Sequence, residues 1–169
     1  MNIVLKAEKF ATMKHGEIGQ VRKYTGEPYI NHPAEVVSIV KSVSHTDEML
    51  AAAWLHDTVE DTITTFEEIE EEFGLTIMEF VKGLTDVSKP EDGNRAIRKA
   101  IDRRHMADQT PFVKTIKLAD LISNSKSILE HDPQFAKVYI EEKRLLLPVL
   151  HEGNKILWIT AYGIAYGKI

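Results

Sequence analysis

Four ionisable side chains occur within the six residues His56–Asp61, directly after the apolar run Met49–Leu55. Charged groups placed beside core-forming sequence are costly to bury unless they have partners. A metal ion, a substrate, or both would supply those partners. The chain must therefore fold so that polar side chains from other segments reach this one.

The composition limits the kinds of site that can form. The chain has 169 residues and no Cys, so a disulfide scaffold and a thiolate zinc site are excluded, and any metal must be held by His, Asp or Glu. The length suits a single domain over residues 1–169. The net charge of −5 disfavours nonspecific nucleic-acid binding, although a small anion could bind where a few basic residues converge.

No apolar run is long enough to span a bilayer, and the apolar start of the chain runs straight into Lys6 without the pattern of a signal peptide. We therefore expect a cytoplasmic protein with no membrane attachment. The sequence leaves the oligomeric state open.

Apolar residues recur at helical spacing along the chain, and no segment alternates cleanly as a strand would. We predict an all-α fold, a single bundle of about eight to ten helices. The first helix should run from Ile3 to a stop at Gly16, followed by a loop over residues 17–31. A second should begin at Pro33, and a third, capped by Asp47, should continue to about Val59.

The later helices have clearer end signals. Thr65 and Glu68 form a capping-box pattern before an acidic helix that should stop at Gly74. Pro111 opens the best-defined helix of the second half. The last helix, over residues 156–166, fits either the core or a dimer face, and the core is the simpler prediction.

Ionisable residues in the charged segment are spaced four apart, which places side chains on the same face of a helix. His56 and Glu60 are four residues apart, so on a continuous helix they would share a face, and Asp57 and Asp61 have the same spacing. Farther on, Asp120 lies in an otherwise apolar helical pattern. A carboxylate in such a position is either paired or bound to a metal.

Two imidazoles and two carboxylates could form a ligand set for Mn²⁺, Fe²⁺, Zn²⁺ or Mg²⁺. A bound ion of this kind can polarise a phosphoryl oxygen and lower the pKa of a bound water. Glu60 and Asp61 are then placed to orient that water and handle its proton. The four candidate ligands are His32, His56, Asp57 and Asp120.

Each residue also has a purely structural interpretation. His32 alone would more commonly be a helix cap or a loop residue, Asp120 could be a buried hydrogen-bond anchor, and Glu60 and Asp61 could belong to a solvated turn. These interpretations do not explain why His56-Asp57 and Glu60-Asp61 occur together. For the other histidines we expect surface or core positions: His15, His45, His105, His131 and His151.

Four strings surround the candidate residues: GEPYINHP at residues 26–33, LHDTVEDT at residues 55–62, GLT at residues 83–85, and KLAD at residues 117–120 with Asn124. They resemble the hydrolase domain of the RelA/SpoT family, a group of HD-domain metal-dependent phosphohydrolases. The resemblance covers about residues 1–130. It is strongest to the stand-alone small alarmone hydrolases, the metazoan SpoT homologues included.

The resemblance implies an all-helical enzyme that removes pyrophosphate from the 3′ position of guanosine tetra- or pentaphosphate. It also implies one Mn²⁺ ion, with other divalent metals possible. Because the sequence has no Walker-type Gly-rich loop and leaves no room for a synthetase domain, we expect neither a synthetase nor a regulatory domain. The ion would be held by His32, His56, Asp57 and Asp120, while Glu60 and Asp61 would position and deprotonate water. The residues implied to contact the nucleotide substrate are Arg22, Lys23, Asn124 and Lys126, the last where the family usually has Arg.

Two features depart from the family's pattern. Leu121 replaces the basic residue that usually follows the last metal ligand, and the stretch between Arg22-Lys23 and His32 is about one residue shorter than in the metazoan enzymes. Guanine and adenine alarmones both remain candidates. The other hypotheses are an HD phosphohydrolase of another nucleotide (ppApp, a nucleoside monophosphate or a dinucleotide), a nucleotide-binding sensor without turnover, and a helical protein with no metal site.

Overall fold

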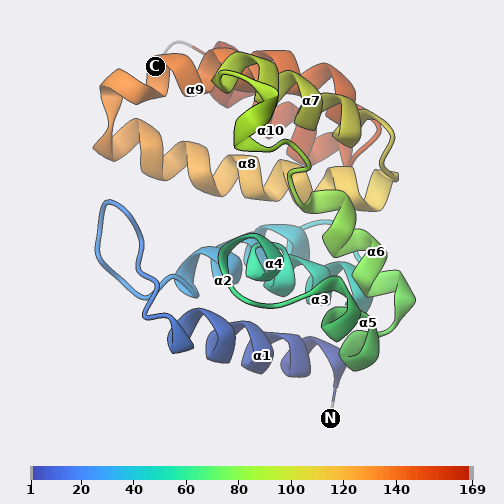
Figure 1. Cartoon of the computed structure of the whole chain (residues 1–169). Coiled ribbons are helices and arrows are strands. Elements are labelled where there is room, and N and C mark those ends of the chain that lie inside the picture. Colours follow the sequence, from blue (N-terminus) through green and yellow to red (C-terminus); the bar gives the residue numbers. More distant parts are fainter. Residues whose placement is uncertain (1, 168–169) are drawn as a thin grey trace. The chain divides into compact units, whose positions relative to one another are not determined.

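The structure is a computed structural model that describes residues 2–167. Within these residues it contains ten α-helices, two 3-10 helices and no strand, which confirms the predicted all-α class (Figure 1). One isolated antiparallel bridge pairs Val21 with Pro28 in the loop between the first two helices. The chain divides into two compact units, residues 1–85 and 86–169, each described separately below. The single domain expected from the sequence stays a prediction.

The first unit is organised around its third helix. Its helices are α1 (Ile3–Glu17), α2 (Asn31–Lys41), α3 (Asp47–Leu55), α4 (Thr58–Asp61), α5 (Phe66–Phe73) and α6 (Leu75–Leu84). Helix α3 packs against α1, α2 and α6, and every residue from Met49 to Leu55 is buried. The apolar run before the charged segment is therefore the core of this unit.

The first two helices differ slightly from their predicted bounds. Helix α1 continues through Gly16 and ends at Glu17, because the left-handed backbone needed to stop it occurs at Gly19, with φ of 61°. Helix α2 begins at Asn31 rather than at Pro33. Proline is tolerated there because the first N–H groups of a helix have no partner within it. His32 consequently lies inside the first turn of α2.

The third helix is shorter than predicted. Thr46 caps it instead of Asp47, with its hydroxyl accepting from the backbone N–H of Met49 at 3.3 Å. The helix ends at Leu55, and α4 starts three residues later. His56 and Asp57, referred to below as the HD pair, form the junction between the two helices.

The predicted start and end of the acidic helix α5 are confirmed. The hydroxyl of Thr65 accepts from the backbone N–H of Glu68 at 3.2 Å, and Gly74 ends the helix with φ of 85°. Both signals are local, so they can be found without knowledge of the tertiary structure.

The second unit is organised around its longest helix. It contains α7 (Arg95–Ala107), α8 (Pro111–His131), α9 (Pro133–Leu146) and α10 (Lys155–Tyr166), with the 3-10 helices η1 (Pro90–Asp92) and η2 (Leu147–Leu150). Helix α8 packs against α9 and α10, and most of its residues between Val113 and Leu121 are buried. Helix α10 turns Leu157, Ala161 and Ala165 into this core. Among the described helices, none combines the length and apolarity needed to cross a bilayer.

We predict that Gly153→Ala destabilises the protein by about 1–3 kcal/mol, because the new Cβ would enter a filled space. It would lie 2.9 Å from Cδ1 of Leu118 and 3.1 Å from backbone atoms of Lys114 and Thr115. Gly163→Ala is the matched control, since nothing lies within 4 Å of a Cβ there. It should be neutral or stabilise α10 by up to about 1 kcal/mol. Urea unfolding of both variants measures the difference, and equal stabilities would contradict the prediction.

Candidate metal centre

The helix junction brings three of the predicted ligands together. His32, His56 and Asp57 each offer one ligand atom, and these atoms all lie within 4.8 Å of one another. Nε2 of His56 is 3.1 Å from Oδ2 of Asp57, and Nε2 of His32 is 3.7 Å from the same oxygen. Both imidazoles are buried, at 1% and 3% exposure. Such a buried group of donor atoms is suited to a cation.

The protonation of His56 follows from its backbone contact. Its Nδ1 lies 2.8 Å from the carbonyl oxygen of Ala53. A carbonyl oxygen only accepts hydrogen bonds, so Nδ1 carries the proton, and in the neutral ring Nε2 directs a lone pair towards Asp57. A lone pair and a carboxylate oxygen at 3.1 Å repel each other unless a positive charge lies between or beside them. The donor set therefore fits a divalent metal ion.

Tyr29 is a site residue that the sequence interpretation missed. Its hydroxyl donates to Oδ2 of Asp57 at 2.6 Å, and its ring lies against His32 with centroids 5.8 Å apart. A hydrogen bond of this kind fixes the orientation of a ligand carboxylate. A usable signal was present, because Tyr29 belongs to the GEPYINHP string and lies three residues before His32.

Asp61 is held by a second pair of residues from the same region. Nε2 of Gln20 donates to Oδ2 of Asp61 at 2.9 Å, and Oε1 of Gln20 lies 2.7 Å from Nδ1 of His15. His15 fixes which way the Gln20 amide faces, because its N–H occupies the amide oxygen and leaves the NH₂ group for Asp61. His15 is buried, which is one of the two positions expected for it, and it also contributes to the site through its contact with Gln20.

Gln20 and Tyr29 belong to one loop between α1 and α2. The backbone N–H of Tyr29 donates to the carbonyl of Gln20 at 3.0 Å, and that of Arg22 donates to the carbonyl of Glu27 at 2.7 Å. The loop thus positions the side chains that hold Asp57 and Asp61. Nothing in the sequence pattern marks Gln20, because its role depends on how this loop folds back on itself.

The carboxyl group of Asp61 has an unusual environment. Partial burial raises its pKa above the ordinary value, the hydrogen bond from Gln20 opposes this, and the nearby negative charge of Asp57 adds to the rise. A carboxyl whose pKa is raised is better suited to accept and return a proton near neutral pH. Glu60 lies beside it on α4 and is exposed.

The remaining predicted ligand, Asp120, belongs to the second unit. It is 7% exposed on α8, where Lys117 donates to its Oδ2 at 3.0 Å and Asn124 donates to its Oδ1 at 2.7 Å. Of the two alternatives that the sequence left open, a paired or a metal-bound carboxylate, these hydrogen bonds agree with pairing. The role of Asp120 as the fourth metal ligand stays a prediction. Leu121, the next residue on the helix, is 2% exposed in the core of this unit.

The predicted nucleotide-binding residues lie on two elements. Arg22 and Lys23 are in the loop between α1 and α2, with the ammonium of Lys23 positioned 4.9 Å from the ring centroid of Tyr24. Asn124 and Lys126 are on α8, and both Lys23 and Lys126 are exposed. Their contacts with a nucleotide stay predictions.

Comparison with known proteins gives consistent matches. Residues 7–144 match the HD domain family. The chain is 37% identical over 138 residues to the guanosine-3′,5′-bis(diphosphate) 3′-pyrophosphohydrolase MESH1 of Danio rerio, covering 78% of this chain and 72% of that protein. It is 35% identical over 149 residues to a guanosine-3′,5′-bis(diphosphate) 3′-pyrophosphohydrolase of Aquifex aeolicus, covering 88% of this chain but only 21% of that much longer protein.

A solved structure shares the fold over nearly the whole chain. It is that of a metazoan orthologue of SpoT that hydrolyses ppGpp, with a TM-score of 0.85 and 28% identity. The match covers 97% of this chain and 94% of the other.

Gln20→Leu should raise the pKa of Asp61 further, because the variant loses a hydrogen bond that stabilises the charged carboxylate. The carboxyl would then ionise at a higher pH than in the unmodified protein. A ¹³C NMR titration of the aspartate carboxyl groups measures the shift. Gln109→Leu is the matched control, since the amide of Gln109 donates to the backbone carbonyl of His105 and not to a carboxylate. An Asp61 pKa that stays the same or falls in Gln20→Leu would contradict this role.

Proposed function

Because the chain belongs to the HD-domain family and is similar to MESH1-type 3′-pyrophosphohydrolases, we propose that it hydrolyses the 3′-pyrophosphate of guanosine tetra- and pentaphosphate. The products would be GDP or GTP and pyrophosphate. The observation that carries the proposal is the cluster of His32, His56 and Asp57, whose ligand atoms lie within 4.8 Å of one another. The names of the relatives support the choice of substrate.

We propose that the cofactor is one Mn²⁺ ion held by His32, His56 and Asp57, with Asp120 of the second unit as the fourth ligand. When bound, the ion supplies a Lewis acid that polarises a phosphoryl oxygen and lowers the pKa of water. Mn²⁺ agrees with a mixed imidazole and carboxylate set. Tyr29 would keep Asp57 oriented through its 2.6 Å hydrogen bond.

The reaction needs proton handling as well as a metal. Water attacks the phosphorus attached to the 3′ oxygen, the bond from that phosphorus to the 3′ oxygen breaks, and the proton lost by water must reach the departing oxygen. Asp61, with its raised pKa, would accept and return this proton, and Glu60 would orient the water. Arg22, Lys23, Asn124 and Lys126 would contact the nucleotide, and the reaction would take place in the cytoplasm.

Incubation of the purified protein with ppGpp and Mn²⁺, followed by ion-exchange chromatography, tests the function directly. We expect GDP and pyrophosphate in equal amounts. A parallel incubation with ppApp tests base preference, and nucleoside monophosphates test the broader phosphohydrolase hypothesis. Tight binding of ppGpp without product under Mn²⁺, Mg²⁺, Zn²⁺ and Fe²⁺ would instead identify a sensor and contradict the proposal.

Two substitutions should separate metal binding from proton handling. Asp57→Ala removes a proposed ligand, so both bound metal and turnover should be lost. Glu60→Ala should keep the metal while kcat falls by about 10²–10⁴-fold, the usual contribution of a positioned acid or base. Metal content by elemental analysis, measured beside kcat, distinguishes the two. A near-normal kcat in Glu60→Ala would show that the assigned role is wrong.

A further inference from the structure

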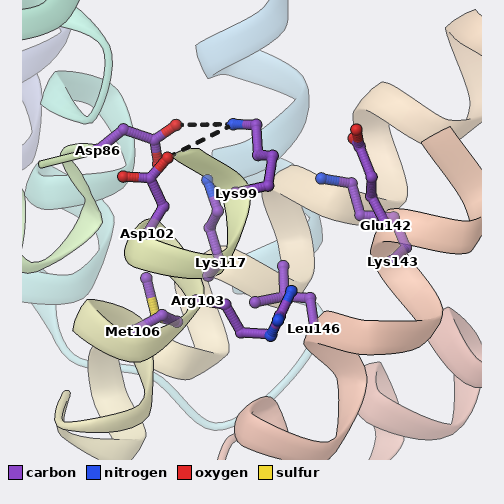
Figure 2. Close-up of a pocket in the computed structure, with 9 residues that line it drawn as sticks. All are labelled: Asp86, Lys99, Asp102, Arg103, Met106, Lys117, Glu142, Lys143 and Leu146. Atoms are coloured by element: carbon purple, nitrogen blue, oxygen red, sulfur yellow. Dashed lines mark hydrogen bonds and ion pairs between the residues drawn. The ribbon is translucent and has the colours of Figure 1, made fainter. Parts of the chain in front are cut away.

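The second unit contains a small cavity of about 50 Å³ lined by residues from α7, α8 and α9 (Figure 2). Four cationic side chains reach it from these three helices: Lys99 and Arg103 on α7, Lys117 on α8 and Lys143 on α9. A gathering of like charges round an enclosed space is unfavourable unless negative groups neutralise it. The cavity also has carboxylates, so their contacts decide how much of the positive charge remains.

Two of the carboxylates accept their hydrogen bonds from groups other than Arg103 and Lys143, and Lys143 acts on Asp86 only through its charge. Asp86 accepts from Lys99 at 2.8 Å, as the dashed line in Figure 2 shows. Asp102 accepts from the backbone N–H groups of residues 87 and 88 at 3.0 and 2.9 Å, and from the hydroxyl of Ser88 at 2.8 Å. These hydrogen bonds tie the two carboxylates to the loop before α7 and to Lys99.

The third carboxylate at the cavity is also committed. Glu142 forms a two-pronged pair with Arg95, whose Nε and Nη2 donate to its two oxygens at 2.6 and 3.0 Å. Such a bidentate pair uses the favourable directions of both oxygens and is among the stronger ion pairs. Glu142 therefore neutralises Arg95 first, rather than the cations inside the cavity.

Arg103 and Lys143 are left without an acceptor of their own. Within residues 2–167, neither forms a hydrogen bond or an ion pair; the ammonium of Lys143 lies 4.5 Å from the ring centroid of Tyr139. Burial, reinforced by the positive charge of Lys117, lowers the pKa of Lys143 to about 8. An anion in the cavity would relieve this mutual repulsion and satisfy donors that the chain itself leaves unused.

We propose that this cavity binds the oxyanion of a phosphate group, with Arg103, Lys117 and Lys143 as its donors. A phosphate carries up to two negative charges and accepts several hydrogen bonds at once, which suits cations arriving from three helices. The planar guanidinium of Arg103 can bind two oxygens together, and the ammonium groups can each bind one. Free phosphate, pyrophosphate and the phosphate groups of a nucleotide all share this chemistry. The cavity shares one residue with the proposed metal centre, because Lys117 also donates to Oδ2 of Asp120 at 3.0 Å. Within residues 2–167, Arg103 and Lys143 form no hydrogen bond to a proposed metal ligand.

The test is titration calorimetry of the full chain carrying Asp57→Ala, with EDTA present, so that neither turnover nor a metal-bound anion contributes. Inorganic pyrophosphate should bind with a stoichiometry of one. Lys143→Met and Arg103→Met, each added to this background, should weaken binding by about tenfold or more, as expected for the loss of a charged hydrogen bond. Lys143→Arg, which keeps the charge, should retain binding and separates charge from packing.

Two control variants remove the same charge at exposed positions on the same helices. Lys137→Met on α9 and Arg104→Met on α7 should change the affinity by less than about twofold, since exposed charges act weakly through water. Equal weakening in all four charge-removing variants would overturn the proposal, and so would the absence of pyrophosphate binding to the Asp57→Ala protein.

Titration of ppGpp and of guanosine into the same proteins identifies the source of the phosphate group. If Lys143→Met weakens the binding of ppGpp as much as that of pyrophosphate, and guanosine does not bind the cavity, the occupant is a nucleotide phosphate. If the binding of ppGpp is unchanged while the binding of pyrophosphate is weakened, the occupant is the free anion. Both results support the site and differ only in what fills it.

Discussion

The first unit depends on one electrostatic constraint, the convergence of donor atoms from His32, His56 and Asp57 in a largely buried space. Desolvated lone pairs and a carboxylate cannot stay together without positive charge. The surrounding structure supports them rather than separating them: the carbonyl of Ala53 fixes the proton on His56, and the hydroxyl of Tyr29 holds Asp57. Helix α3 ends at Leu55, and the HD pair forms the junction with α4, where the backbone of Asp57 (φ −99°, ψ −3°) differs from that of His56 (φ −56°, ψ −33°).

The second unit handles its polar groups differently. Helix α8 is its central helix, yet it carries Asp120 and Lys117 as a neighbouring pair on the helix that also supplies most of the core. Leu121 faces that core at 2% exposure, so a charged side chain at this position would have to be buried there. Positive charge is instead collected by side chains of α7, α8 and α9 around one cavity. The positive charge around this cavity therefore comes from side chains of three helices and not from one sequence motif.

The sequence predicted what local chemistry controls. Propensity and pattern were enough to predict the all-α class, the cap at Thr65, the helix end at Gly74 and the helix start at Pro111. The clustering of His32 with the HD pair agrees with the types of ligand that the sequence offered. The predicted end of α3 was wrong, because the helix stops at Leu55 and helical structure resumes at Thr58 in α4, although residues 56–59 are compatible with one continuous helix. Gln20 and His15 could not be assigned, since a loop must fold before a neutral amide can reach a carboxylate. Asp120 as a ligand stays a prediction.

The loop between α1 and α2 has a consequence for how substitutions would combine. A single backbone pairing, from the N–H of Tyr29 to the carbonyl of Gln20, joins the two residues that hold Asp57 and Asp61. Arg22 lies within the same turn. Asp57 and Asp61 are therefore both positioned by the same loop, and a change in the loop's conformation would displace the hydrogen-bond partners of both carboxylates. The energetic effects of altering its residues would be non-additive, in the manner of neighbours that share partners.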